Sequence, residues 1–362
     1  MVYLSLGSNI GNRLEYLQLA IGLIAYRIGP IKSISSVYET PAWGFESTPF
    51  LNLCLGLTTA FSPEMLLDEL LQIEQQLGRT REDREGYSAR TIDLDILFYD
   101  AVVCDTPKVA IPHPRMHQRR FILQPLCEIA KNQFHPTLMK PVAALEKECT
   151  DPAVLQLLPV NIKCPRVFSF IAIEGTIGIG KTTLTKKLNA LLGGTLLLEN
   201  FLDNPYLEDF YADPVAYALR VETTFLHERV AHYHRFFSHD QKLPIIADFT
   251  LGKSLLFAKV NLTAADYENY VNEFISQTKA LPPPDLVLLL HQNLDGIMKK
   301  INQRGRAFEK NISMDYLKTL NSAYTQEGIH PSIPKIAYAL DGIDLIEDPN
   351  ALYPILLKIF TA

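Results

Sequence analysis

The first 150 residues alternate short, strongly apolar segments with longer segments whose apolar residues recur every three to four positions. This pattern predicts strands at residues 1–8, 31–40, 50–60 and 89–100, and helices at residues 13–28 and 62–78. Ser62 followed by Pro63 is typical of a helix start, because serine caps the helix and proline fits its first turn. Strands outnumber helices and the connections are short, which predicts an α+β sandwich with mostly antiparallel pairing.

The pattern changes near Pro165. Continuously apolar segments follow at residues 167–175, 194–200, 243–249 and 284–291, with helix-type segments between them. Strands that are apolar on both faces indicate an α/β domain with a parallel sheet covered by helices. Residues 146–167 contain three prolines and mark the boundary, so we predict domains at residues 1–158 and 165–362.

Composition narrows the function classes only a little. The 362 residues are 48% hydrophobic and carry a net charge of −6, which is ordinary for a globular protein and disfavours nucleic acid or an anionic membrane as the main partner. Five cysteines without a CxxC pair predict neither a disulfide framework nor a zinc site. The chain starts without a leader-like run, and no segment is as long as a membrane span, so we expect a reduced, soluble, cytoplasmic protein.

Two acids interrupt the apolar strand at residues 89–100. Asp93 and Asp95 share one face of this strand, where two carboxylates repel each other. Two magnesium ions that bridge an ATP triphosphate would remove this conflict. The neighbouring sequence supplies cationic side chains suited to a polyphosphate, namely Arg79, Arg81, Arg90, His113 and Arg119. The alternative is that the two carboxylates only form salt bridges to nearby arginines.

A phosphate-binding loop begins at Gly175. Residues 175–182 match G-x-x-x-x-G-K-[ST] between an apolar strand and a helix, the context that the motif requires. Backbone N–H groups around Gly175, Gly178 and Gly180 and at Thr183 would surround phosphate oxygens. Lys181 would reach the β- and γ-phosphates of ATP, and Thr182 would hold magnesium. A chance glycine turn is the alternative.

Further candidates follow the strands of this second half. Glu199 and Asp248 each end an apolar strand, where parallel sheets place their chemistry. We interpret Glu199 as the base for a substrate hydroxyl and Asp248 as an outer magnesium ligand; helix caps or surface carboxylates are the alternatives. Arg304 and Arg306 would close over the transferring phosphates as a lid, unless they belong to a solvated basic turn.

The second half resembles the deoxynucleoside kinase family in "IEGTIGIGKTTL", "LLENFLDNPYLEDFYADP", "YALRVETTFLHER" and "RGRAFE". The resemblance implies ATP-dependent transfer to the 5′-hydroxyl of a deoxynucleoside, with Glu199 as general base, and a dimer through this half. It also implies a sugar 3′-hydroxyl site and a base pocket, formed by Tyr211, Glu309, Arg229 and Glu222. The sequence departs from the family at Asp248-Phe249-Thr250, where an arginine is usual; Lys253 or the lid arginines would replace it.

Glu222 stands where the family has a base-reading glutamine. A glutamine offers the base a donor and an acceptor, whereas an ionised glutamate only accepts. This predicts a base with amino groups, deoxyadenosine or deoxyguanosine, and poor use of thymidine. The alternative is that Glu222 pairs with Arg229 or Arg220 and never meets the base.

Residues 1 to about 150 resemble 6-hydroxymethyl-7,8-dihydropterin pyrophosphokinases in "LSLGSNIGNR", "SSVYETPAWG", "FLNLCLGL", "ARTIDLDILFYD" and "IPHPRMHQRRFILQPLCEIA". The resemblance implies a ferredoxin-like sandwich and transfer of pyrophosphate from ATP to the pterin hydroxymethyl group. It assigns two magnesium ions to Asp93 and Asp95, and contacts with ATP or its phosphates to Arg79, Arg81, Arg90, His113 and Arg119. Phe50 and Phe121 would sandwich the pterin, and Thr40 and Asn52 would bind its edge. Core packing is the alternative for both phenylalanines. Ser88 and Lys108 are mild departures from the family pattern.

The sequence therefore predicts a bifunctional kinase with ATP and magnesium as cofactors and two small-molecule substrates. Two alternatives concern the second half, which would be a non-catalytic nucleotide-binding module or a nucleoside monophosphate kinase. A binding module need not keep Glu199, Tyr211 and Glu309, and a monophosphate kinase calls for a further arginine cluster. Catalysis on a nucleoside is the preferred reading.

Overall fold

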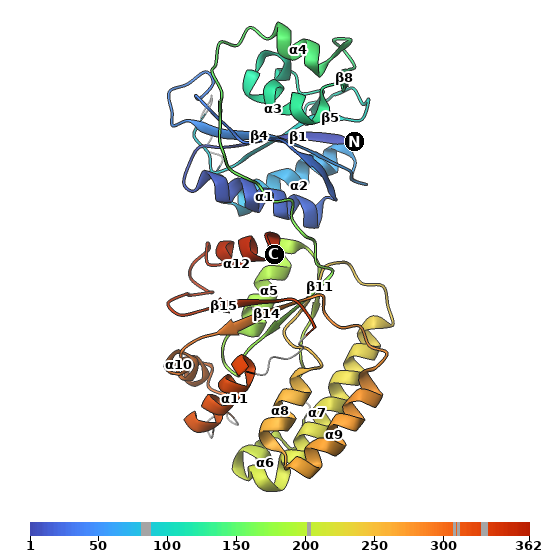
Figure 1. Ribbon diagram of the computed structural model, residues 1–362, viewed down its shortest axis with the longest axis vertical. Coiled ribbons are helices and arrows are strands. Elements are labelled where there is room, and N and C mark those ends of the chain that lie inside the picture. The colour runs from blue at the N-terminus through green and yellow to red at the C-terminus, as the bar shows by residue number, and fades with distance from the viewer. Residues whose placement is uncertain (81–87, 201–203, 307–308, 310–311, 327–331) are drawn as a thin grey trace. The chain divides into compact units, whose positions relative to one another are not determined.

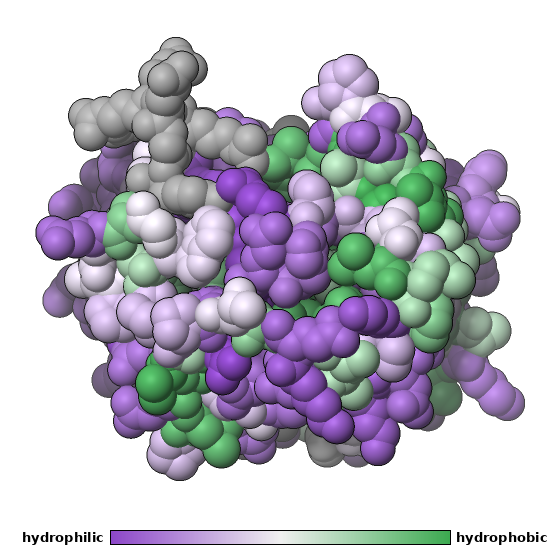
Figure 2. Space-filling view, turned by 90° about the horizontal axis from the view of Figure 1, so that it is seen from above, coloured by the Kyte–Doolittle hydropathy of each residue, from purple (hydrophilic) through white to green (hydrophobic). Residues whose placement is uncertain are grey.

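The computed structural model describes residues 1–80, 88–200, 204–306, 309, 312–326 and 332–362. The chain divides into two compact units (Figure 1), of which the first comprises Met1–Val167 with Leu356–Ala362 and the second Phe168–Ile355. No described helix is long and apolar enough to cross a membrane. On the face that Figure 2 shows, small groups of hydrophobic residues alternate with hydrophilic ones.

The first unit is built on a six-stranded antiparallel sheet in the order β10-β3-β4-β1-β5, with β2 also paired to β4. Helices α1 and α2 cover one face of this sheet, and α3 and α4 lie on the other (Figure 1). Its elements are β1 (Val2–Ser8), α1 (Arg13–Arg27), β2 (Ile31–Ile34), β3 (Tyr38–Thr40), β4 (Phe50–Leu57), α2 (Pro63–Gln76), β5 (Asp93–Tyr99), β6 (Cys104–Asp105), β7 (Ala110–Ile111), a 3-10 turn (Met116–Gln118), α3 (Arg120–Ala130), β8 (Phe134–His135), β9 (Lys140–Pro141), α4 (Val142–Glu148) and β10 (Gln156–Leu157).

Two boundaries in this unit can be compared with the elements predicted from the sequence. The Oγ of Ser62 accepts a hydrogen bond from the backbone N of Met65 at 3.3 Å, and α2 begins at Pro63, which confirms the predicted helix start. The single strand expected at residues 31–40 is instead two. Between the pairs Ile34↔Leu55 and Tyr38↔Asn52, three residues face two on β4, so the chain bulges there.

The second unit holds a five-stranded, wholly parallel sheet in the order β12-β13-β11-β14-β15, as the sequence predicts for this half. Its elements are β11 (Phe170–Glu174), α5 (Lys181–Leu192), β12 (Thr195–Leu197), α6 (Leu207–Ala212), α7 (Pro214–Phe237), β13 (Ile245–Ala247), α8 (Lys253–Asn261), α9 (Ala264–Thr278), β14 (Leu286–His291), α10 (Leu294–Arg304), α11 (Met314–Gln326) and β15 (Lys335–Ala339). The last helix, α12 (Tyr353–Phe360), begins in this unit, and its residues from Leu356 onward count with the first unit.

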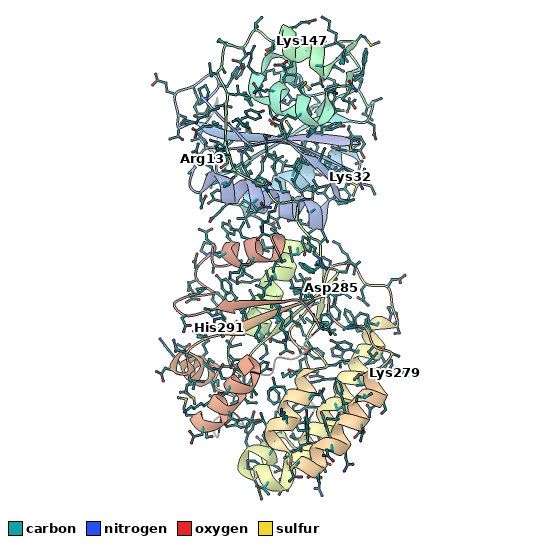
Figure 3. The ribbon with its side chains drawn as sticks, in the orientation of Figure 1. Arg13, Lys32, Lys147, Lys279, Asp285 and His291 are labelled. Carbon is teal, nitrogen blue, oxygen red and sulfur yellow. The ribbon has the colours of Figure 1, made fainter. Side chains whose placement is uncertain are left out.

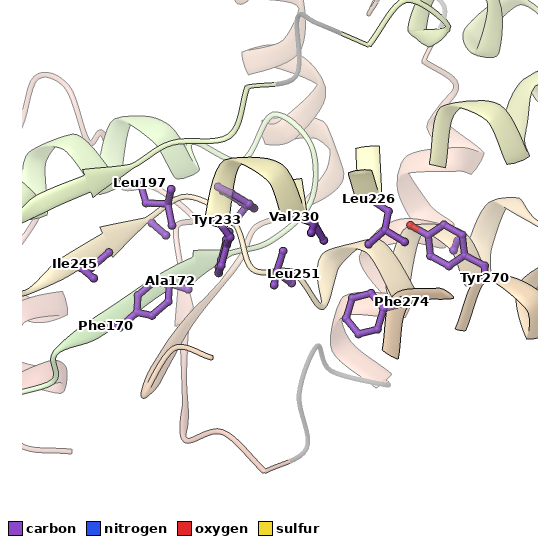
Figure 4. Close-up of a cluster of buried hydrophobic side chains, with 13 residues drawn as sticks. Phe170, Ala172, Leu197, Leu226, Val230, Tyr233, Ile245, Leu251, Tyr270 and Phe274 are labelled. Atoms are coloured by element: carbon purple, nitrogen blue, oxygen red, sulfur yellow. The ribbon is translucent and has the colours of Figure 1, made fainter. Parts of the chain in front are cut away.

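Alternate residues of these strands face a hydrophobic cluster on one side of the sheet. Phe170 of β11 packs against Tyr233 of α7, with ring centroids 6.3 Å apart, and Ala172 of β11 and Phe274 of α9 belong to the same cluster (Figure 4). The register of β11 and β14 is also fixed at the ends of these strands that lie away from the phosphate loop. The carboxylate of Asp285, labelled in Figure 3, accepts hydrogen bonds from the backbone N of Ser169 at 2.8 Å and of Phe170 at 3.0 Å. These contacts hold the beginning of β14 beside the beginning of β11. Because the two strands are parallel, their carboxyl ends lie together at the opposite end of the sheet.

Candidate active sites

Strand β5 presents Asp93 and Asp95 on one face while Leu94 and Ile96 are buried on the other. Asp93 forms ion pairs with Arg79 at 2.6 Å and Arg90 at 3.0 Å. Burial opposes its ionisation, but the two guanidinium groups hold the pKa of Asp93 below its usual value. The salt-bridge alternative therefore describes Asp93.

Asp95 differs from its neighbour. It forms no ion pair with a described residue, and burial, followed by the charge of Asp93, raises the pKa of Asp95 to about 7. A second ionised carboxylate is thus costly at this position unless a further positive charge arrives. The charges of Arg119 and Arg79 only partly offset these two effects.

These two acids lie in a cleft of about 510 Å³ that collects most of the predicted residues of the first unit. Its lining includes Thr40, Phe50, Asn52, Arg90, Asp93, Asp95, Arg119 and Phe121. Asn52 donates a hydrogen bond from Nδ2 to the Oγ1 of Thr40 at 2.7 Å, which fixes the amide against the cleft. The floor is Gly7 of β1, where a Cβ would lie only 2.8 Å from the Oδ1 of Asn52.

Two aromatic residues of the cleft were not singled out from the sequence. Trp43 lies 4.8 Å from the guanidinium of Arg119, measured to the ring centroid, and Phe45 packs edge-on against Phe50 at 6.3 Å. Arg119 also stands 5.6 Å above the ring of Phe121. Trp43 is the only tryptophan of the chain and lies in a segment that carries the family resemblance. The sequence could therefore have indicated it as a cleft residue.

Two predicted phosphate contacts, Arg79 and His113, are not part of the cleft lining, and a third is not described. Arg79 is not part of the cleft lining; it pairs with Asp93 and with the buried Glu74. His113 is also absent from the cleft lining, and burial, followed by the charges of Arg119 and Arg115, lowers its pKa to about 4, so that its ring is neutral at pH 7. Arg81 lies outside the described residues.

The segment after α4 supports both walls of this cleft. The backbone N of Arg120, at the start of α3, donates a hydrogen bond to Oδ2 of Asp151 at 3.0 Å, and the guanidinium of Arg120 donates to the carbonyl of Cys149 at 3.1 Å. Strand β10 pairs with β3, which ends at Thr40. Residues 149–157 therefore fix the strand and the helix that carry Thr40 and Phe121.

The predicted phosphate loop joins β11 to α5. Gly180 has φ +111°, a left-handed conformation that glycine adopts at little cost, and it precedes the first residue of the helix. The Nζ of Lys181 donates to the carbonyl oxygens of Gly175 at 2.8 Å and Thr176 at 3.2 Å. Burial, followed by the charge of Lys253, lowers the pKa of Lys181 to about 8.

Asp248 connects this loop to the end of the neighbouring strand. Its Oδ2 accepts a hydrogen bond from the Oγ1 of Thr182 at 2.5 Å, and its Oδ1 accepts one from the backbone N of Glu199 at 2.7 Å. The two residues predicted to hold magnesium are therefore adjacent, and Glu199 is placed directly beside them. Groups of three or more His, Cys, Asp and Glu side chains suited to a metal do not occur in the described parts of the chain.

Glu199 is clamped between two cations. Its Oε1 accepts hydrogen bonds from the Nε and Nη2 of Arg229 at 2.9 and 2.7 Å, and its Oε2 pairs with the Nζ of Lys253 at 2.5 Å. Burial opposes ionisation, but Lys253 and Arg229 lower the pKa of Glu199 to about 2. It is thus neither a helix cap nor a surface carboxylate.

A lysine lies close to the position where the family has an arginine. Phe249, which stands in its place, is fully buried in the hydrophobic cluster beneath the sheet, so this position points away from the cleft. The cation comes one helical turn later, from Lys253 at the start of α8, whose side chain is 8% exposed. Thr250 completes the turn by donating its Oγ1 and its backbone N to the buried Glu174.

Glu222 lines the same cleft, and the pairing with Arg229 or Arg220 considered above is wrong. The guanidinium of Arg229 binds Glu199 and the Oγ of Ser254, and that of Arg220 lies near the rings of Tyr206 and Tyr217. The partner of Glu222 is instead Asn261, whose Nδ2 donates to Oε1 at 2.7 Å. Neither Asn261 nor Tyr316, also at the cleft, was singled out from the sequence.

The lid arginines converge on one acid. The guanidinium of Arg304 donates to both carboxylate oxygens of Glu309, at 3.0 Å through Nε and 2.5 Å through Nη2, and Arg306 donates to its Oε1 at 3.3 Å. Tyr211 stands close enough for the charge of Glu309 to contribute, after burial, to raising the pKa of the phenol. The predicted sugar site and the predicted lid thus share one carboxylate.

The second cleft measures about 810 Å³ and brings most of the predicted residues of this unit together. Those in its lining are Gly178, Lys181, Thr182, Glu199, Tyr211, Glu222, Arg229, Asp248, Arg304, Arg306 and Glu309, with Lys253 beside them. Gly175, Gly180 and Thr183 are not part of the lining, although they shape the loop and the first turn of α5.

Comparison with known proteins decides what these clefts belong to. Residues 3–131 match the family of 7,8-dihydro-6-hydroxymethylpterin-pyrophosphokinase, and residues 171–359, more than half of the chain, match the deoxynucleoside kinase family. The chain belongs to both families. It therefore combines a pterin pyrophosphokinase domain with a deoxynucleoside kinase domain, as the sequence motifs predicted.

Two relatives with similar sequences agree with this assignment. The 2-amino-4-hydroxy-6-hydroxymethyldihydropteridine pyrophosphokinase of Aquifex aeolicus (strain VF5) is 40% identical over 150 residues, which are 41% of this chain and 92% of that protein. Deoxyguanosine kinase of Bacillus subtilis (strain 168) is 36% identical over 157 residues, 43% of this chain and 76% of that protein. A solved structure of deoxyadenosine kinase from M. mycoides with bound dATP covers 52% of this chain and 98% of its own, at 26% identity and a TM-score of 0.46.

Proposed function

We propose that the first unit transfers pyrophosphate from ATP to the hydroxymethyl group of 6-hydroxymethyl-7,8-dihydropterin and releases AMP. The second unit transfers the γ-phosphoryl group of ATP to the 5′-hydroxyl of a purine deoxynucleoside and releases ADP. The observation that supports this most strongly is that each family match coincides with a cleft holding the acids, cations and aromatic rings that its reaction needs.

In the first cleft, flat aromatic walls and a fixed polar edge suit a pterin. Phe50 and Phe121 would stack on the ring, and the hydrogen-bonded pair of Thr40 and Asn52 would bind its edge. Arg119 would bind phosphate oxygens close to the pterin, since it lies over Phe121. We assign the ferredoxin-like fold to this unit as part of the same proposal.

Asp93 and Asp95 fit two magnesium ions, because both carboxylates line the cleft and Asp95 forms no ion pair with a described residue, although the charges of Arg119 and Arg79 act on it. When bound, magnesium would neutralise the charge that develops on the transferring phosphates. Arg90 would keep Asp93 ionised and oriented through its ion pair. Arg79 would do the same from the other side of that carboxylate.

In the second cleft, the phosphate loop and Lys181 would hold the phosphates of ATP, while Thr182 and Asp248 fit one magnesium ion that would neutralise phosphate charge. Glu199 would accept the proton of the 5′-hydroxyl, and Tyr211 with Glu309 would hold the 3′-hydroxyl. Lys253, Arg304 and Arg306 are the cations available to the transferring phosphoryl group.

The purine preference rests on Glu222 and on the relative named deoxyguanosine kinase. At about pH 8 the carboxyl group of Glu222, whose pKa is about 7, is largely ionised and presents only acceptors. Purines with amino groups would satisfy it, whereas the carbonyl oxygens of thymine would not. The dimer through the second unit that the family resemblance implies stays a prediction.

A panel of substrates tests the proposal. The purified chain is incubated with ATP, magnesium and either the dihydropterin or one of four deoxynucleosides, and AMP and ADP are measured separately. We expect AMP only with the pterin, and ADP most efficiently with a purine deoxynucleoside and least with thymidine at about pH 8. ADP release with nucleoside monophosphates alone would favour the monophosphate kinase, and ATP binding without turnover would favour the non-catalytic module.

A further inference from the structure

The carboxyl group of Glu222 has one satisfied oxygen and one that is not. The residue lies in the middle of α7, is 2% exposed and lines the cleft of the second unit. Its Oε1 accepts from Asn261, whereas its Oε2, although buried, has no hydrogen-bond partner among the described residues. A buried polar atom left in this way is costly, which is expected of an atom that awaits a ligand.

The charged groups around Glu222 do not supply the missing partner. On the same helix, Arg229 is bound to Glu199 and Ser254, and Lys253 of α8 is bound to Glu199. The groups that face it from α6, α9 and α11 are the phenols of Tyr211, Tyr270 and Tyr316. Burial raises the pKa of each phenol, so all three are neutral near pH 7. Both nearby cations therefore serve another acid, and Glu199 itself adds negative charge.

We propose that Glu222 reads the nucleobase as a neutral carboxylic acid, with Oε2–H as donor and Oε1 as acceptor, and that loss of this proton changes which purine the cleft prefers. The inference rests on the proposed deoxynucleoside kinase activity of the second unit. In its neutral form Glu222 presents the same donor and acceptor pair as the glutamine usual in the family. Glutamate in place of glutamine thus keeps the pattern of hydrogen bonds, but the charge of the side chain now changes with pH.

The electrostatics support a proton on this group near neutral pH. Burial raises the pKa of Glu222 to about 7, against the opposing effects of Arg229, the hydrogen bond from Asn261, and Lys253. The carboxyl group therefore changes charge within the range in which kinases are usually assayed. Glutamine has no such transition, which makes Glu222→Gln the matched control.

The two purines respond to this charge in opposite ways. The edge of adenine that carries N1 offers an amino donor beside a ring acceptor, which matches a neutral acid. The same edge of guanine offers two adjacent donors, N1–H and the 2-amino group, which match the two acceptors of a carboxylate. Deprotonation of Glu222 should therefore shift the preference from deoxyadenosine towards deoxyguanosine.

The test is the ratio of kcat/KM for deoxyadenosine to that for deoxyguanosine, measured with the full chain from about pH 6 to about pH 8. Effects on ATP, on Glu199 or on the phosphate loop cancel in this ratio, because both substrates share them. For a group with a pKa of about 7 the neutral fraction falls about tenfold over this range while the ionised fraction rises about tenfold, and we expect the ratio to fall by up to about a hundredfold. In Glu222→Gln the ratio should stay constant.

Three outcomes would overturn the inference. A ratio that is independent of pH in the native chain, or a pH dependence that survives in Glu222→Gln, removes Glu222 as the titrating reader while leaving the kinase activity in place. If the Gln variant does not fold, the native profile still decides. Failure of the native chain to phosphorylate or bind any deoxynucleoside would instead overturn the proposed function, and this inference with it.

Discussion

At the scale of single residues, Asp93 and Asp95 have the same chemical nature but different surroundings. Asp93 is neutralised by Arg79 and Arg90, whereas Asp95 carries a pKa raised by burial and by its neighbour. We expect Asp95→Asn to lower AMP formation with the dihydropterin by at least about a hundredfold, because a cation loses its anionic ligand. Asp93→Asn should have a similar effect and also remove one ion pair from each of Arg79 and Arg90.

The second activity of the same sample is the control for this experiment. ADP formation with a deoxynucleoside should be unchanged in both variants, since Glu199 and the phosphate loop belong to another unit. AMP release at the native rate by both variants at low magnesium would be incompatible with a two-metal role for these acids.

Glu199 gives the second residue-scale prediction. Glu199→Gln keeps the shape of the side chain but removes a proton acceptor, and general bases contribute roughly 10²- to 10⁴-fold, so ADP formation should fall by that order. ATP binding should persist because the phosphate loop is untouched. A variant that turns over at nearly the native rate would mean that Glu199 serves only to hold Arg229 and Lys253 in place.

At the scale of elements, the start of α3 links the segment after α4 to the pterin cleft. Asp151 accepts from the first backbone N–H of α3, one residue before Phe121. Asp151→Ala should cost about 1 kcal/mol of unfolding free energy and raise the KM for the dihydropterin. Ser62→Ala is the matched control: it removes the cap of α2, which contributes nothing to the cleft lining, and should cost similar stability without changing that KM.

Much of the fold and of both sites could be predicted because the information is local in sequence. Apolar runs gave the parallel sheet of the second unit, and a run of eight residues located its phosphate loop. Partnerships between distant elements could not be predicted. Glu199 meets Arg229 and Lys253 across 30 and 54 residues, and Glu222 meets Asn261 across 39, through helices whose rotation only packing determines.

At the scale of the whole molecule, one chain combines two kinase domains, and we propose that both use carboxylates to hold magnesium beside the phosphates of ATP. Removing magnesium with a chelator should stop the release of AMP and of ADP together, and added magnesium should restore both. This joint loss contrasts with Asp95→Asn, which should remove AMP alone. Persistence of either product in excess chelator would show that the corresponding unit works without a divalent ion.

Glu309 accepts hydrogen bonds from both Arg304 and Arg306, which has a consequence for the hydrolysis of ATP in the absence of a nucleoside. While Glu309 holds both guanidinium groups, its single negative charge offsets part of their positive charge and restrains both side chains from assisting attack on ATP by water. A nucleoside whose 3′-hydroxyl occupies Glu309 would release them when a proper acceptor is present, so futile hydrolysis should stay slow. Glu309→Gln should raise nucleoside-independent ADP release several-fold while weakening nucleoside phosphorylation; an unchanged background rate would show that the arginines are not restrained in this way.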